Sequence, residues 1–66
     1  MTDWFIVHRT EWIREIIEVY GYINREHVEK KFGVSTPQAS QDLQRAVEQY
    51  PEIVYNKVSK RYEYQP

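Results

Sequence analysis

The chain has 66 residues, of which 41% are hydrophobic and 29% are charged, and its formal net charge is −1. This length leaves room for one domain, so we expect a single domain over residues 1–66. The lack of cysteine excludes disulfide bonds and thiolate metal sites. No apolar run approaches the roughly 20 residues that cross a bilayer, which predicts a cytoplasmic protein without a membrane partner. The near-neutral charge counts against a nonspecific binder of polyanions.

Apolar residues recur at helical spacing over about residues 3–20, and Gly21 ends this pattern. Two starting points are open. Thr2 or Asp3 could cap one long helix, or Thr10 could cap a shorter helix that leaves residues 4–7 as a separate arm.

A long first helix would carry two apolar stripes. A second stripe of residues spaced by seven lies beside the core face, and such surplus apolar surface suggests a partner. The alternative is that this second stripe closes over a later hairpin. The expected core face contains Ile6, Ile13, Ile17 and Tyr20, and the predicted dimer interface contains Trp4, Phe5, Trp12 and Val19.

Asn24 is expected to cap a second helix that runs to about Phe32, with Val28 and Phe32 directed inward. Residues 22–23 before it are too few to be predicted as a strand from their pattern alone, but in a winged fold they would pair with the wing. Arg25 begins the second helix and could meet a phosphate. The outward Glu26 and Glu29 are expected to be only solvated.

A tight turn separates the second helix from a third. Gly33 supplies a permissive backbone, Ser35 is a candidate N-cap, and Gln38 completes a possible capping box. Pro37 falls in the first helical turn, where its missing N–H costs nothing. So short a turn predicts the steep helix crossing of a helix-turn-helix.

The third helix has one apolar face and one face of amides and a guanidinium. These polar groups can form paired hydrogen bonds with base edges in the major groove, which predicts a recognition helix. The alternative is an ordinary solvated surface, because glutamine is a good helix former. The expected inner residues are Ala39, Leu43, Ala46, Val47 and Tyr50, and the outer ones are Gln38, Gln41 and Arg45, flanked by Gln44 and Glu48.

Pro51 ends the third helix, and residues 53–55 and 61–64 are β-branched or aromatic runs joined by a polar turn. This pattern predicts a hairpin wing. Lys57, Lys60 and Arg61 are expected at or near its tip, in contact with the DNA backbone or the minor groove. The alternative is a charged hairpin that only discourages aggregation.

The sequence gives little support for a metal site or for catalysis. With His8 and His27 as the only histidines, a metal site is not expected. No nucleophile with a base and no pair of catalytic carboxylates is recognisable, so we expect neither an enzyme nor a cofactor. The tyrosines of the hairpin are expected to pack rather than to stack on bases.

Three segments resemble a known family: Gly21-Tyr22-Ile23-Asn24-Arg25, Phe32 to Leu43 with its Pro37-Gln38-Ala39-Ser40 stretch, and Lys60-Arg61-Tyr62. Over roughly residues 9–64 the chain is similar to the N-terminal winged helix-turn-helix of the DeoR-like WYL-domain bacterial transcription regulators. The resemblance implies a dimeric, repressor-like DNA-binding module, as in regulators of defence islands and mobile elements. The chain stops at Pro66 without a WYL domain, so either a free-standing regulator from a phage or mobile element or a fragment of a longer regulator is expected.

The resulting prediction is an α+β winged helix-turn-helix, with three helices followed by a two-stranded β-hairpin wing. We expect a dimeric repressor that binds double-stranded DNA and no small-molecule ligand. The alternative is a winged-helix module for protein contact, such as a phage-encoded inhibitor or an assembly subunit. The predicted DNA-binding residues are Arg25, Ser35, Thr36, Gln38, Ser40, Gln41, Gln44, Arg45, Lys57, Lys60 and Arg61.

Overall fold

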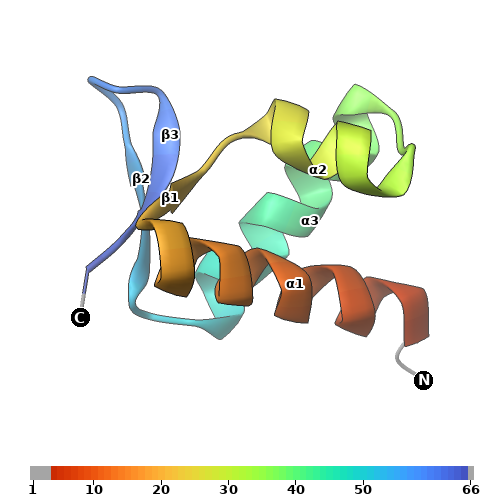
Figure 1. The fold of residues 1–66 in the computed structure, drawn as a ribbon, viewed down its shortest axis with the longest axis horizontal. Coiled ribbons are helices and arrows are strands. Elements are labelled where there is room, and N and C mark those ends of the chain that lie inside the picture. The colour runs from red at the N-terminus through yellow and green to blue at the C-terminus, as the bar shows by residue number, and fades with distance from the viewer. Residues whose placement is uncertain (1–3, 66) are drawn as a thin grey trace.

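A computed structural model describes residues 4–65 and confirms the predicted α+β winged helix-turn-helix (Figure 1). Helix α3 packs against both α1 and α2, and the small sheet stands at the end of α1. The wing rises from there to the side on which α2 lies. In chain order the elements are α1 (Trp4–Tyr20), β1 (Tyr22–Ile23), α2 (Arg25–Phe32), α3 (Thr36–Gln49), β2 (Ile53–Asn56) and β3 (Arg61–Tyr64).

Helix α1 is continuous from Trp4, so the alternative of a separate arm over residues 4–7 is wrong. Thr10 does not cap a helix but lies buried inside α1, where its Oγ1 donates a hydrogen bond to the carbonyl of Ile6 at 2.8 Å. This bond satisfies a hydroxyl that would otherwise be costly to bury. The other candidate caps, Thr2 and Asp3, lie outside the described residues.

The sheet has the order β1-β3-β2, and both strand pairs are antiparallel. Tyr22 lies opposite Glu63 across the first pair, and Ile53 lies opposite Tyr64 across the second. The short segment before α2 therefore joins the wing, as a winged fold requires. Gly21, with a φ of 88°, makes the left-handed turn that leads from α1 into β1.

The core lies where the three helices meet the sheet. Two details differ from the expected core face of α1: Ile6 is only half-buried, and Tyr20 is 69% exposed. The chain turns away at Gly21 directly after Tyr20, so its ring stays at the surface. No helix among residues 4–65 is both long and apolar enough to cross a membrane. The buried hydrophobic residues are Ile13, Ile17, Ile23, Val28, Ala39, Leu43, Ala46 and Ile53.

Candidate nucleic-acid interface

The turn between α2 and α3 forms as the sequence predicts. Gly33 is left-handed, with a φ of 64°, and its N–H donates to the carbonyl of Glu29 at 2.8 Å. Ser35 caps α3 by accepting a hydrogen bond from the backbone N–H of Gln38 at 3.3 Å. The side chain of Gln38 does not complete a capping box, because it donates to Asp42 instead. A full capping box joins Asn24 and His27 at the start of α2.

Helix α3 turns its amide-rich face outward, but this face is narrower than predicted. Gln41 and Gln44 are exposed and stand clear of the protein body, next to the exposed Glu48. Gln38 and Arg45 are half-buried on one flank of α3, so the expectation that they point directly away from the core is wrong. The physical reason is a buried carboxylate between them, on Asp42.

The sequence did not predict a role for Asp42, whose side chain is 0% exposed. Arg9 of α1 donates from Nε to Oδ2 of Asp42 at 2.6 Å, and Gln38 donates from Nε2 to Oδ1 at 3.1 Å. Arg45 adds an ion pair, with Nη1 at 3.5 Å from Oδ1. One sequence signal could have indicated this cluster. Gln38 and Arg45 lie about one helical turn on either side of Asp42.

A polar hollow of about 390 Å³ opens between α2, α3 and the wing. It brings together three predicted contact residues from three elements: Arg25 at the start of α2, Ser40 of α3 and Lys60 of the wing. Tyr55 and Tyr62 line its wing side, with ring centroids 4.8 Å apart. Tyr55 and Tyr62 therefore pack against each other across the hairpin.

Thr36, at the first position of α3, is tied to α2. Its Oγ1 donates to Oε1 of Glu29 at 3.1 Å, and Nε of Arg25 lies 3.7 Å from Oε2 of the same carboxylate. The expectation that Glu29 is only solvated is therefore wrong, because this residue links the two helices of the helix-turn-helix. Arg25 and Thr36 both remain exposed at the surface.

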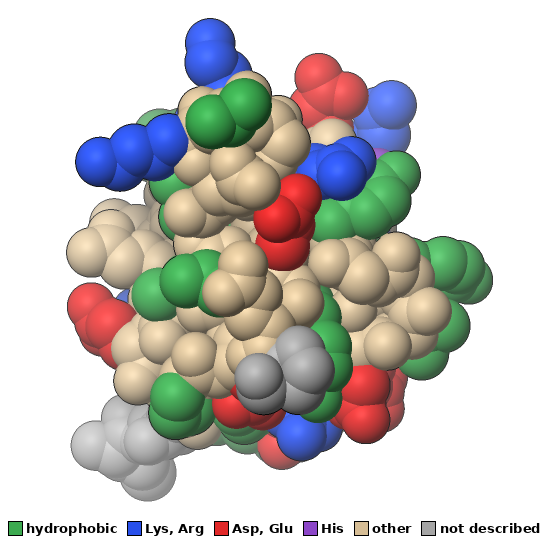
Figure 2. Space-filling model, turned by 90° about the vertical axis from the view of Figure 1, so that its left-hand side faces the viewer, with side chains coloured by type: hydrophobic (Ala, Val, Ile, Leu, Met, Phe, Trp, Pro, Cys, Tyr) green, Lys and Arg blue, Asp and Glu red, His purple; other side chains and the backbone are tan. Residues whose placement is uncertain are grey.

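The wing presents two exposed lysines at its turn. Asn56 shapes the turn by accepting hydrogen bonds from the backbone N–H groups of Val58 and Ser59. Lys57 and Lys60 are exposed, and Val58 between them is 94% exposed. Figure 2 looks from the side of the wing and shows Lys and Arg side chains gathered in its upper part, where the wing ends.

Arg61 begins β3 directly after the wing turn, so it lies near the wing tip and not in the turn itself. Its guanidinium carbon lies 4.3 Å from the centroid of the Tyr22 ring, and its Nε donates to Oε2 of Glu63 at 3.0 Å. Hydrogen bonds from Asn56, Arg61 and Ser59 lower the pKa of Glu63. Arg61 is therefore held along the sheet by an aromatic ring and a carboxylate.

The predicted dimer stripe is only partly exposed. Trp4, Phe5 and Val19 are exposed on α1, whereas Trp12 packs edge-on against Phe32 of α2, with ring centroids 5.2 Å apart. The stripe therefore closes in part over α2 rather than over the wing. No group of three His, Asp or Glu side chains that could hold a metal ion occurs within residues 4–65.

Comparison with known families gives one match. A family model described as the BrxR transcriptional regulator winged helix-turn-helix domain covers residues 7–66. No curated protein matches the chain. The matched region includes the whole helix-turn-helix and the wing, together with all but the start of α1.

Proposed function

The chain belongs to the BrxR transcriptional regulator winged helix-turn-helix family, and from this premise we propose that it recognises a specific sequence in double-stranded DNA. Membership in this family supports a DNA-binding regulator in general. Our finer proposal is a small homodimeric repressor of prokaryotic or phage origin, in which α3 reads bases and α2 and the wing contact phosphates.

The observation that carries this proposal is the exposed amide face of α3. Gln41 and Gln44 stand on a helix that follows a tight turn, and no acidic side chain is paired with either of them within residues 4–65. A glutamine amide can both donate to and accept from the edge of adenine, which discriminates between bases by about 1–3 kcal/mol. A helix of this kind lies in the major groove with its first turns nearest the bases.

Phosphate contacts are assigned to groups around this face. Arg25 and Lys60 lie on the polar hollow beside Ser40, and Lys57 extends the basic edge at the wing. The start of α3, at Ser35 and Thr36, adds backbone N–H groups that favour an anion. Arg61, stacked on Tyr22, is assigned a supporting role in the electrostatic field of the wing.

Arg45 and Gln38 are proposed to contact the DNA from the flank of α3. Two guanidinium groups share the carboxylate of Asp42, so the cluster keeps a surplus positive charge. The side chain of Arg45 is 40% exposed. Because Arg9 and Gln38 already donate to Asp42, Arg45 can turn to a base or a phosphate without leaving that carboxylate unpaired.

The test begins with selection of bound sequences from random duplex DNA, followed by fluorescence anisotropy at two salt concentrations. Gln41→Ala and Arg45→Ala are expected to lose about tenfold preference for the selected sequence over random DNA. Gln49→Ala, which removes an exposed amide at the last residue of α3, is the matched control and should retain that preference. Lys60→Ala should weaken binding to all sequences and lower the salt slope by about 1. Equal losses at both DNAs for every variant would refute these roles.

Dimerisation is proposed through the exposed apolar residues of α1, chiefly Trp4, Phe5 and Val19, with Trp12 at the edge. A two-fold dimer would bind half-sites about 34 Å apart. Sedimentation with and without a duplex carrying two selected half-sites tests this proposal. A protein that stays monomeric on such a duplex would contradict it.

A protein-contact module is the second candidate. The exposed Trp4 and Phe5 and the net charge of −1 favour it. No retardation of the DNA upstream of its own gene at either salt concentration, together with a protein partner recovered by pull-down, would support this candidate over the regulator.

A further inference from the structure

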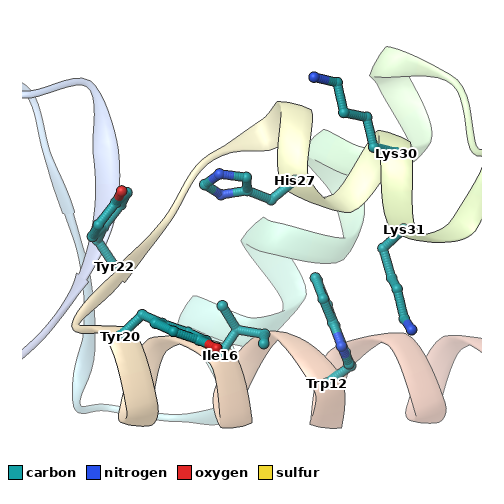
Figure 3. A pocket seen from close by; sticks show the side chains of 7 residues that line it. All are labelled: Trp12, Ile16, Tyr20, Tyr22, His27, Lys30 and Lys31. Atoms are coloured by element: carbon teal, nitrogen blue, oxygen red, sulfur yellow. The ribbon is translucent and has the colours of Figure 1, made fainter.

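A second hollow of about 470 Å³ lies between α1, β1 and α2, and it shares no residue with the predicted DNA-binding set (Figure 3). Helix α3, which carries the amide face, contributes nothing to it. The two surfaces can therefore be occupied at the same time. The lining residues are Trp12, Ile16, Tyr20, Tyr22, His27, Lys30 and Lys31.

The floor of this hollow is apolar and mainly aromatic. Trp12 and Ile16 pack against the core with their inner surfaces and leave their outer surfaces in the hollow. Tyr20 and Tyr22 extend the floor toward the sheet, and both are exposed. Figure 3 shows the Trp12 ring rising from α1 toward α2, with Ile16 and Tyr20 beside it along the helix.

The wall of the hollow supplies hydrogen-bond donors and positive charge. Lys31 descends from α2 toward α1, and its Nζ lies 5.9 Å from the centroid of the Trp12 ring. Nδ1 of His27 accepts a hydrogen bond from the backbone N–H of Asn24 at 3.2 Å. The neutral ring therefore carries its proton on Nε2, which makes that atom a donor. Figure 3 shows the ring directed from α2 toward Tyr22.

The positive charge of this wall is not neutralised by the protein itself. Within residues 4–65, no Asp or Glu lines the hollow and neither Lys30 nor Lys31 forms an ion pair. Lys30 is directed away from the floor, so Lys31 is the cation best placed to meet a ligand. An aromatic floor beside unpaired cations is complementary to an anion with an apolar body.

We propose that this hollow binds a small organic anion, a carboxylate on an aromatic or branched apolar body. The volume lies in the range of small-ligand sites, which combine a mostly apolar lining with a few polar groups. The body of the ligand rests on Trp12, Ile16 and Tyr20, while Lys31 pairs with the carboxylate. Nε2 of His27 provides a second donor at the other end of the hollow. This site replaces the expectation that the protein has no small-molecule ligand.

Naphthylacetate is the probe, and naphthylacetamide, which has the same shape without the charge, is its control. Backbone amide NMR shifts of the full chain are followed during titration with each compound in the absence of DNA. We expect naphthylacetate to shift the resonances of residues in α1, β1 and α2 around the hollow. The amide should bind at least about fivefold more weakly, since it lacks the ion pair.

Two variants with the same loss of charge separate this site from general attraction. Lys31→Gln should weaken naphthylacetate about fivefold, whereas Lys57→Gln, at the distant wing tip, should leave its affinity unchanged. Equal affinity for the two compounds, equal effects of the two variants, or shifts outside the hollow would overturn the proposal. So would sedimentation showing that a second copy covers the hollow and that the probe does not displace it. None of these outcomes depends on DNA binding.

Discussion

Two polar networks hold parts of this small fold in place, and they differ in their exposure to water. The first joins α1 to α3 through Arg9 and Asp42, whose side chains are 14% and 0% exposed. The second lies in the wing, where Asn56, Ser59 and Arg61 all donate to the carboxylate of Glu63 at 2.9–3.2 Å. Each network converges on one carboxylate, and each of these two carboxylates accepts three hydrogen bonds.

Burial makes the two networks energetically unequal. Removing one partner of a buried ion pair leaves a charge without water or counter-charge, which typically costs several kcal/mol. In the wing, water replaces a lost hydrogen bond at little cost. We infer that the position of α3 is fixed strongly by α1, whereas the wing is fixed weakly and can adjust to whatever it contacts.

The most damaging change is expected to be Asp42→Ala. Loss of the carboxylate leaves Arg9 largely buried without a partner, which should lower the free energy of unfolding by about 3 kcal/mol. For a chain of this length that is a large part of the total, since stability averages about 0.1 kcal/mol per residue. Urea denaturation followed by circular dichroism measures the loss. Glu48→Ala, an exposed carboxylate on the same helix, should change stability by less than about 0.5 kcal/mol.

The double change Arg9→Met with Asp42→Leu sharpens the comparison. Arg9→Met alone should cost about 2 kcal/mol, less than loss of Asp42, because Gln38 still donates to the carboxylate. The double variant should be more stable than Asp42→Ala, since apolar side chains of similar volume replace the pair. A double variant as unstable as the sum of the two single changes would show that the pair is not the source of the stability.

Acidification should loosen the wing. The pKa of Glu63 lies below its ordinary value of 4.5, so its contribution to wing stability is complete above that pH. That contribution is lost as the pH falls through the lowered pKa of the folded state. Amide hydrogen exchange of residues 53–64, compared with residues 4–20, measures the effect. Glu63→Gln should abolish the difference while leaving the urea midpoint of the whole chain unchanged.

The last prediction concerns Lys60, whose φ of 59° is left-handed. A β-branched side chain fits this conformation poorly and glycine fits it well. Lys60→Gly should therefore be more stable than Lys60→Val by about 1 kcal/mol, although the two changes remove the same charge. Thermal denaturation of the two variants decides the point, and equal midpoints would contradict it.

The fold could be predicted because its signals are local. Gly33, Ser35 and Asn24 act through backbone atoms a few residues away, so their roles can be recognised in the sequence. The buried Asp42 could not be predicted, because a carboxylate is by default a surface residue. Its main partner Arg9 lies 33 residues away in the sequence.

The outer face of α3 was predicted too broadly, because Gln38 and Arg45 were expected on it. Helical spacing predicts the direction of a side chain around the helix axis, but it does not show which neighbouring residue binds that side chain. Asp42 draws Gln38 and Arg45 to one flank of α3. Asp42 lies in the same helix, but it is buried because α1 packs against α3 and supplies Arg9. Gln41 and Gln44, without such partners, point outward as helical spacing predicts.

The strand order affects the order in which the parts of the fold can form. Strand β3 is the middle strand of the sheet and also the last of the six elements in chain order. Until β3 is in place, neither β1 nor β2 has its partner strand. The three helices contact one another without needing β3, because these contacts lie among residues 4–49. We therefore expect the helical part to assemble first and the sheet to close in a single late step.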